Sequence, residues 1–294
     1  MTVSTLQAAW DSGIRYFDVA PWYGFGLGER RVGDFLREQP DDSYVLSTKV
    51  GRLMHPVPTD KVPNYGYIDP LPFDATYDYS YDGIMRSVEF SYARLGLNRI
   101  DILYVHDIGS YTHGRALNEH YLGQLLGSGL KALEELKSSG TIKAYGLGVN
   151  EVPVCLDVMH AADIDCILMA GRYTLLDRSA VAELLPLCEK KGTSLVVGGV
   201  FNSGILATGP VPGAHFDYLP ATPQILAKVG AMAGRVRPEA EGTSALAMKL
   251  SCMGRDSARS RETPRGGQRP AAALGSAFTA LSMRSTCLSG LRFW

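Results

Sequence analysis

Four polar residues in this 294-residue chain have the types and positions that proton-transfer chemistry requires. Asp18 and Tyr23 follow one apolar run, Lys49 ends a second and His106 ends a third. A nearby ammonium favours the phenolate form, so we expect Lys49 to lower the pKa of Tyr23 from about 10 toward neutral pH. A carboxylate at Asp18 would hold that ammonium, and an imidazole at His106 would orient the reacting oxygen. The set predicts a general acid–base site.

Each of these residues also has an ordinary structural explanation. Asp18 fits a turn or helix cap, Tyr23 half-buried packing, Lys49 a charge that reaches solvent and His106 a hydrogen-bonded structural histidine. The functional interpretation is favoured because the four occur together, in this order, at the ends of three consecutive predicted strands.

The elements that would position these residues follow from six short apolar runs, which read as strands. Each run is apolar on both faces, as parallel strands covered on both sides are. Amphipathic stretches, several of which end in glycine, separate them and predict helices. The recurring βα order indicates a parallel α/β fold, and in a barrel the carboxyl ends of the strands form one rim where active sites are built. The runs are residues 14–20, 43–50, 99–108, 142–149, 165–171 and 193–200.

The alternating glycines Gly24, Gly26 and Gly28 raise a different possibility, a phosphate cradle in a doubly wound sheet. That motif is G-x-G-x-x-G, and its last glycine is missing here. The following strand ends in Lys49 instead of the acidic residue that would bind a ribose. We therefore interpret the glycines as a turn that leads from the strand into the next helix.

Bulk properties exclude several classes of protein. The net charge of −1 gives no argument for binding nucleic acid or a membrane surface. The N-terminal stretch lacks the features of a signal peptide, and no apolar run approaches a membrane span. The five cysteines are scattered and lack a CxxC pair, so we expect neither a disulfide framework nor a bound metal. These properties predict a soluble protein of a reducing compartment, the cytoplasm.

Two regions depart from the simple repeat. Residues 51–82 form a long connection rich in proline and tyrosine, which we expect to be an ordered lid. The βα pattern fails near residue 235, where the composition becomes rich in Arg, Ser and Gly, as in disordered or poorly packed segments. The chain is therefore divided into a barrel-like domain, 1–234, and an atypical segment, 235–294.

The residues quoted above carry a resemblance to a known family. The stretches GIRYFDVAPWYGFGLGERRVGDFL, VLSTKVG and RIDILYVHD resemble the aldo-keto reductases. That likeness implies a (β/α)8 TIM-type barrel, here apparently without its first strand, and NAD or NADP as cofactor, with NAD favoured. It also implies that Tyr23 is the general acid/base, that Asp18 and Lys49 tune it, and that His106 positions the substrate oxygen.

The same resemblance suggests residues that hold the cofactor. Asn150 in GLGVNEV matches the family's nicotinamide segment, and Phe201, Asn202 and Gly204 lie in VVGGVFNSGIL, which aligns with a second cofactor segment. A stacking aromatic ring expected at Gly198 would have to be absent or supplied by Phe201. Three positions depart from the usual family residues: Val149, Ala170 and Gly198.

One branch is the most similar, the sugar and pyridoxal dehydrogenases. This likeness implies oxidation of a cyclic hemiacetal, an aldose such as L-fucose or pyridoxal, to a lactone. The candidate pocket residues are Trp22, Phe25, His55 and Tyr111. The alternative is a catalytically impaired barrel that acts as a binding or regulatory protein. The expected partner is a small molecule, with no nucleic acid and no membrane, and the sequence does not indicate the oligomeric state.

Overall fold

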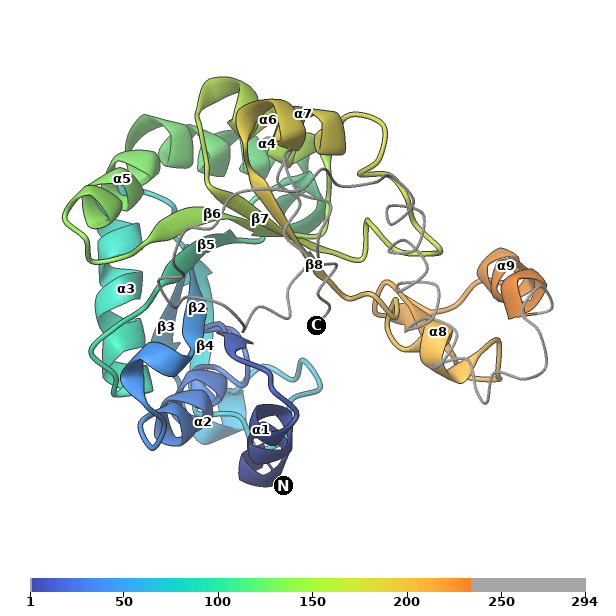
Figure 1. Cartoon of the computed structure of the whole chain (residues 1–294), viewed down its shortest axis with the longest axis horizontal. Helices are drawn as coiled ribbons and strands as arrows, with labels where there is room; N and C mark the ends of the chain where they lie inside the picture. The colour runs from blue at the N-terminus through green and yellow to red at the C-terminus, as the bar shows by residue number, and fades with distance from the viewer. Residues whose placement is uncertain (1, 234–294) are drawn as a thin grey trace, which may run out of the picture. The chain divides into compact units, whose positions relative to one another are not determined.

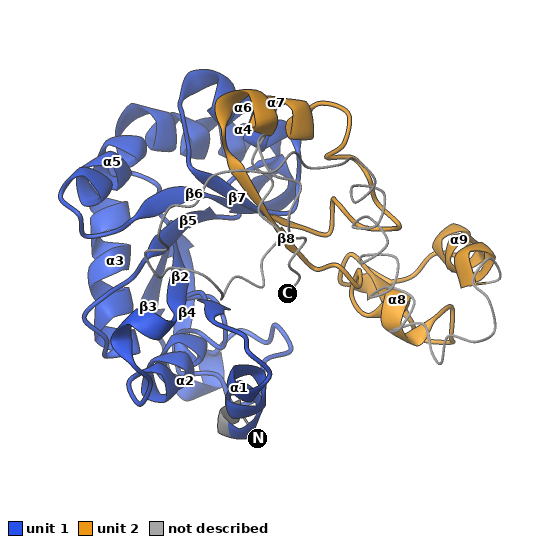
Figure 2. Cartoon of the chain, viewed as in Figure 1, with its two compact units in different colours: residues 1–168, 277–279 blue, residues 169–276, 280–294 orange. Residues whose placement is uncertain are grey.

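The computed structural model describes residues 2–233, with side chains from Ser4 onward. The atypical segment 235–294 lies outside the described residues. Two compact units divide the described chain, and the boundary falls between Leu168 and Met169 (Figure 2). No helix within residues 2–233 is both long enough and apolar enough to cross a membrane.

The first unit contains a parallel sheet whose strands alternate with helices along the chain (Figure 1). Strands β1, β2, β5 and β6 pair in that order, and β7 follows β6 in the sheet. Because the strands are parallel, their carboxyl ends meet at the same edge. The strand bounds are β1 (Tyr16–Asp18), β2 (Val45–Val50), β5 (Ile102–His106), β6 (Ala144–Val149) and β7 (Cys166–Ala170), which crosses the unit boundary.

Helices of the first unit connect these strands, and α2, α3 and α5 lie on their outer side in Figure 1. Helix α3 shows how the sequence specifies such an element. The Ser80 side chain accepts a hydrogen bond from the Gly83 N–H at 3.2 Å, and Gly96 ends the helix at φ 62°. The helix bounds are α1 (Thr2–Asp11), α2 (Leu27–Leu36), α3 (Tyr81–Leu95), α4 (Ser110–Gln124), α5 (Leu130–Ser138) and α6 (Pro153–Ala161).

A β-hairpin lies within the long connection between β2 and α3. Its strands are β3 (Arg52–Pro56) and β4 (Phe73–Tyr77), which pair antiparallel with His55 opposite Asp74. The hairpin begins at Gly51, where φ is 97° and an added Cβ would lie 2.3 Å from the Tyr79 ring. The connection is therefore ordered, as the sequence predicted, but its two strands were not predicted.

The second unit continues the alternation after β7. Its buried core contains Leu176, Ile205, Leu206 and Val229. The Gly171 N–H donates to the Gly198 oxygen at 3.0 Å, so the end of β7 is bonded to the end of β8. The elements are α7 (Leu184–Lys191), β8 (Ser194–Gly198), α8 (Ile205–Thr208), β9 (His215–Phe216), β10 (Leu219–Pro220) and α9 (Pro223–Ala233).

The six strands predicted from apolar runs are all present within the predicted ranges. The amphipathic stretches also form helices α2, α3, α5 and α7. Helices α4 and α6 were not predicted. Helix α4 has a weak apolar pattern and contains non-helical backbone at Gly114. Helix α6 is only nine residues long, from Pro153 to Ala161, and exposes Asp157 and His160 on the face opposite its buried residues.

Two helical glycines predict opposite effects of a Gly→Ala substitution on the free energy of unfolding. An added Cβ at Gly33 in α2 would lie 1.8 Å from the Leu95 carbonyl oxygen, whereas at Gly123 in α4 nothing lies within 4 Å. We expect Gly33→Ala to lower the free energy of unfolding by about 3 kcal/mol because the helices must separate. Gly123→Ala should raise it by about 0.5–1 kcal/mol. Urea unfolding of both variants tests this, and equal effects would contradict the close approach of α2 and α3.

Candidate active site

The structure brings Asp18, Tyr23, Lys49 and His106 to one edge of the first unit. Asp18 ends β1, Lys49 lies near the end of β2 and His106 ends β5, while Tyr23 belongs to the turn before α2. The strand register places Lys49 opposite Tyr104 of β5, the strand that His106 ends. The parallel strand order therefore places three of the four side chains, and the turn adds the fourth.

Lys49 is the centre of this group. Its side chain is 1% exposed, and its Nζ atom lies 2.5 Å from Asp18 Oδ2. The same atom donates to the Val19 carbonyl at 3.0 Å. It also lies 4.7 Å from the centroid of the Tyr23 ring. Tyr23 and His106 complete the arrangement with ring centroids 6.1 Å apart and planes nearly perpendicular at 89°.

The charges in the site follow from burial and these contacts. Burial alone would lower the pKa of the Lys49 ammonium. The contacts with Asp18 and Tyr23 outweigh this effect and raise the pKa to about 12. Burial, with Arg52 and Lys49 nearby, holds the pKa of His106 well below its usual value. Lys49 is therefore charged and His106 neutral at physiological pH.

The pKa of Tyr23 corrects the sequence-based expectation. Desolvation by the surrounding protein raises the pKa of the phenol more than the Lys49 ammonium lowers it, so the pKa lies above the usual value of 10.0. The expectation counted the ammonium and not the desolvation. Tyr23 keeps 38% of its surface exposed, which leaves it accessible to a small molecule.

An ion pair beside His106 was missed at the sequence level. Arg52 in β3 pairs with Asp107, and Asp107 Oδ2 lies 3.4 Å from His106 Nε2. The Arg52 guanidinium is 6% exposed at its side chain and stacks on Trp22 at 4.2 Å and on Tyr77 at 4.8 Å. Their positions in the sequence were a usable signal, because Arg52 closely follows Lys49 and Asp107 directly follows His106. Their meeting depends on the unpredicted hairpin.

Tyr79 also contacts His106 and was also missed as a site residue. Its hydroxyl donates to the His106 carbonyl at 2.7 Å and lies 3.0 Å from His113 Nε2. The His113 ring packs edge-on against Tyr77 with centroids 4.4 Å apart. Burial and Arg52 lower the pKa of His113 to about 4. This aromatic contact joins α4 to the hairpin with neutral side chains.

The predicted pocket residues fall into two groups. Trp22 belongs to an aromatic cluster with Tyr65 at 4.8 Å and Phe25 at 5.3 Å between ring centroids. Phe25 is fully buried, so it supports Trp22 and exposes no surface of its own. His55 lies in β3, and Tyr111 opens α4 with half of its surface exposed. For all four residues, a pocket role stays a prediction.

The predicted cofactor residues belong to both units. Asn150 follows β6 in the first unit. Phe201, Asn202 and Gly204 lie in the second, where Phe201 packs against the core cluster around Ile205. The use of Phe201 as a ring that stacks on the nicotinamide stays a prediction.

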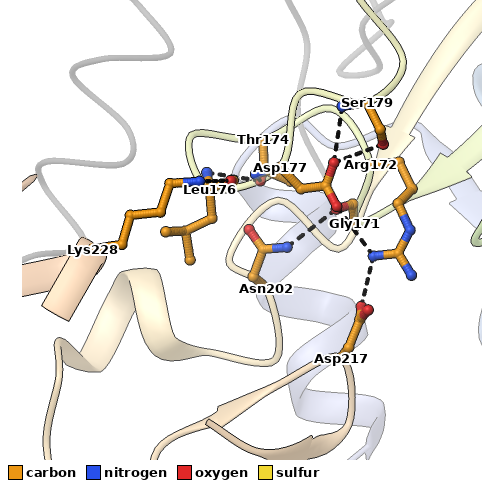
Figure 3. Close-up of polar contacts among 9 residues, drawn as sticks. All are labelled: Gly171, Arg172, Thr174, Leu176, Asp177, Ser179, Asn202, Asp217 and Lys228. Carbon is orange, nitrogen blue, oxygen red and sulfur yellow. Dashed lines mark hydrogen bonds and ion pairs between the residues drawn. The ribbon is translucent and has the colours of Figure 1, made fainter. Parts of the chain in front are cut away.

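A polar cluster fixes the loop around Asn202 in the second unit (Figure 3). Asn202 Nδ2 donates to the Gly171 carbonyl at 3.2 Å. Arg172 lies 2.8 Å from Asp217 and 3.5 Å from Asp177, so it joins two further loops. Asn202 Oδ1 is buried and has no hydrogen-bond partner among the described residues. A buried polar atom without a partner is uncommon and calls for an explanation.

Comparison with known proteins identifies a family and its relatives. Residues 2–238 match the Aldo/keto reductase family. Pyridoxal 4-dehydrogenase from Microbacterium luteolum is 49% identical over 232 residues, which are 76% of this chain and 68% of that protein. D-threo-aldose 1-dehydrogenase from a Pseudomonas species is 41% identical over 221 residues, 73% of this chain and 64% of that protein. The chain thus spans about two thirds of the length of these relatives.

Two solved structures are similar in fold. An aldo-keto reductase from Bacillus halodurans, in its holo form, has a TM-score of 0.64 over 85% of this chain and 72% of its own. A glycerol dehydrogenase from Gluconobacter oxydans has a TM-score of 0.63 over 84% and 71%. Each is 24% identical to this chain, so the likeness concerns the fold alone. It confirms the predicted TIM-type barrel class.

Proposed function

The chain belongs to the aldo/keto reductase family, and on that premise we propose that it is an NAD(P)-dependent dehydrogenase of cyclic hemiacetals. The proposed reaction oxidises an aldose such as L-fucose, or pyridoxal, to a lactone. The observation that carries the proposal is the position of the buried Lys49 ammonium, 2.5 Å from Asp18 and 4.7 Å from the centroid of the Tyr23 ring. An ammonium in that place stabilises the phenolate that a base must become.

The proposed chemistry assigns each residue an action on the anomeric group. The Tyr23 phenolate takes the proton of the anomeric hydroxyl, and the C–O bond becomes the lactone carbonyl. Bound NAD(P) supplies the acceptor for the hydride that leaves the same carbon. Lys49 holds the phenolate by charge, and Asp18 holds Lys49. The neutral His106 ring orients the substrate oxygen by hydrogen bonding.

The cofactor contacts form a second part of the proposal. We assign them to Asn150, Phe201, Asn202 and Gly204. Support comes from Asn202, whose buried Oδ1 has no partner among the described residues and suits an amide or hydroxyl donor of the cofactor. NAD is favoured over NADP by the resemblance to the sugar and pyridoxal dehydrogenases.

The substrate class rests on the two curated relatives, whose names specify pyridoxal and D-threo-aldose. The exposed aromatic side chain of Tyr65 beside Trp22 offers a flat apolar surface of the kind that sugar and pyridine rings pack against. We further propose that the protein works in the cytoplasm, because the cysteines within the described residues, Cys155, Cys166 and Cys188, form no disulfide.

A substrate panel tests this function. Purified protein is mixed with NAD or NADP and L-fucose, other aldoses or pyridoxal, and NAD(P)H absorbance is followed. We expect at least one of these hemiacetals to be oxidised. The matched methyl glycoside should give no signal, because it has no anomeric hydroxyl proton for Tyr23 to take. Oxidation of the glycoside at the same rate would contradict the assigned chemistry. Cofactor binding without turnover of any substrate would favour the impaired barrel instead.

A further inference from the structure

The carboxylate of Asp18 has a second partner besides Lys49. Its Oδ2 atom lies 2.5 Å from Lys49 Nζ, and its Oδ1 atom accepts a hydrogen bond from the Ser47 hydroxyl at 2.6 Å. The Asp18 side chain is 12% exposed and Ser47 is fully buried. Water therefore has little access to replace either contact, and each oxygen of the carboxylate has its own fixed donor.

The strand register explains why Ser47 is in this place. Ser47 of β2 lies opposite Asp18 of β1. Side chains alternate between the faces of a strand, so Ser47 and Lys49 share one face of β2 and Thr48 points to the other. The Thr48 hydroxyl indeed donates to Glu29 of α2, also at 2.6 Å. Two neighbouring hydroxyls thus bind two carboxylates, and those carboxylates lie on opposite faces of the strand.

The residues behind Ser47 are neutral. Tyr16 lies two residues before Asp18, and its hydroxyl is 2.9 Å from the Tyr104 hydroxyl. Both rings are buried, and burial raises the pKa of both phenols, so they stay protonated. They add no charge next to Asp18. The Ser47 hydroxyl, which also interacts with the Tyr16 hydroxyl, contacts the carboxylate oxygen that does not bind Lys49.

We propose that Ser47 is a positioning residue whose hydroxyl holds the Asp18 carboxylate so that its other oxygen stays on Lys49. Through Asp18, Ser47 keeps the ammonium in place beside Tyr23. The effect on turnover rests on the proposed function, because it requires Tyr23 to exchange a proton with the substrate. The effect on Lys49 itself does not depend on any reaction.

Two isosteric substitutions separate positioning from general stability. Ser47→Ala removes the hydroxyl bonded to Asp18, and Thr48→Val removes the adjacent hydroxyl bonded to Glu29. Both bonds are 2.6 Å long and made to a carboxylate, the first part-buried and the second buried, so both variants should unfold more easily than the parent chain. We expect Ser47→Ala alone to lower kcat, about tenfold, with little change in KM. Thr48→Val should keep the parent kcat.

A second readout needs no activity. The pH titration of Lys49 is followed by the 13Cε resonance of labelled lysine. The charged and titratable groups that act on this ammonium are Asp18, Tyr23, His106 and Asp107. Without the Ser47 hydroxyl the Asp18 carboxylate can turn away from the ammonium, and this weakens the contact with Asp18 that raises the pKa of Lys49. Ser47→Ala should therefore lower the pKa of Lys49 relative to the parent, and Thr48→Val should not.

The outcomes are distinct. Ser47 has no positioning role if Ser47→Ala leaves both kcat and the Lys49 titration unchanged. The same conclusion follows if Thr48→Val changes kcat and the Lys49 titration as much as Ser47→Ala does. If the Lys49 titration moves but the parent chain oxidises no substrate, the positioning of Asp18 stands and the proposed function fails. If Ser47→Ala does not fold, Ser47→Cys keeps a weaker donor. That variant should lower the pKa of Lys49 relative to the parent chain, and parent-like behaviour would overturn the proposal.

Discussion

Replacing Tyr23 by phenylalanine is expected to lower the kcat of the proposed oxidation by about 10²–10⁴-fold, the usual contribution of a general acid–base group. The ring and its packing remain, and the single hydroxyl is lost. Tyr23 keeps 38% of its surface exposed, so the substitution removes little buried structure. Circular dichroism and the unfolding midpoint should match those of the parent chain, and cofactor affinity should change little.

The pH dependence gives the same prediction a second signature. Desolvation holds the pKa of Tyr23 above its usual value, so the phenol is protonated at neutral pH. Oxidation requires the phenolate, and its rate should rise with pH up to the pKa and level off above it. Reduction of the lactone or aldehyde requires the phenol and should stay flat below that pKa. Residual activity of Tyr23→Phe should lack the rise.

Tyr81→Phe is the matched control for this experiment. The Tyr81 hydroxyl donates to Glu135 at an exposed position between α3 and α5. We expect its kcat and pH profile to equal those of the parent. Parent-like turnover by Tyr23→Phe, or an equal loss in Tyr81→Phe, would show that the phenol of Tyr23 is not the acid–base group.

The parts of the fold that the sequence predicted are those specified by local pattern. Runs apolar on both faces, such as the one that contains Leu46 and Val50, can be buried in only a few ways, and parallel strands are the common one. The hairpin β3–β4 lacks such a pattern. Arg52 and His55 interrupt one strand and Asp74 the other, because this ribbon is only partly buried. Its pairing across a long connection cannot be read from neighbouring residues.

The site divides in the same way. Asp18, Lys49 and His106 could be placed together because the ends of parallel strands meet whatever the details of packing. Arg52 reaches Asp107 through the hairpin, which was not predicted. The direction of the Tyr23 pKa was wrong for a related reason. It depends on the balance between one favourable charge and the desolvation of the phenol, and desolvation requires the packed structure.

Replacing Lys49 by methionine is expected to lower both turnover and stability. The substitution removes the charge beside Tyr23, so kcat should fall by about 10²-fold or more. It also leaves the Asp18 carboxylate, 12% exposed, with the Ser47 hydroxyl as its remaining side-chain donor in the described site. Breaking a buried ion pair on one side costs about 3–5 kcal/mol, and we expect a loss of that order in the free energy of unfolding.

An exposed lysine provides the control for burial. Lys137 lies 2.6 Å from Asp165, almost as close as Lys49 to Asp18, but its side chain is 42% exposed. Solvent screens that pair, so Lys137→Met should cost less than about 1 kcal/mol and leave kcat unchanged. Urea unfolding of the two variants compares ion pairs of similar length that differ in burial. Equal losses would contradict a dominant role for burial.

The double variant Asp18→Asn/Lys49→Met separates the two effects of the lysine. It removes the stranded carboxylate along with the ammonium, and the Ser47 hydroxyl can still donate to the amide oxygen. Most of the lost stability should return, because no unpaired charge stays buried. Turnover should not return, because nothing then stabilises the Tyr23 phenolate. Recovery of both would mean that Lys49 serves the fold and leaves the chemistry to other groups, whereas recovery of stability alone places the ammonium in the reaction.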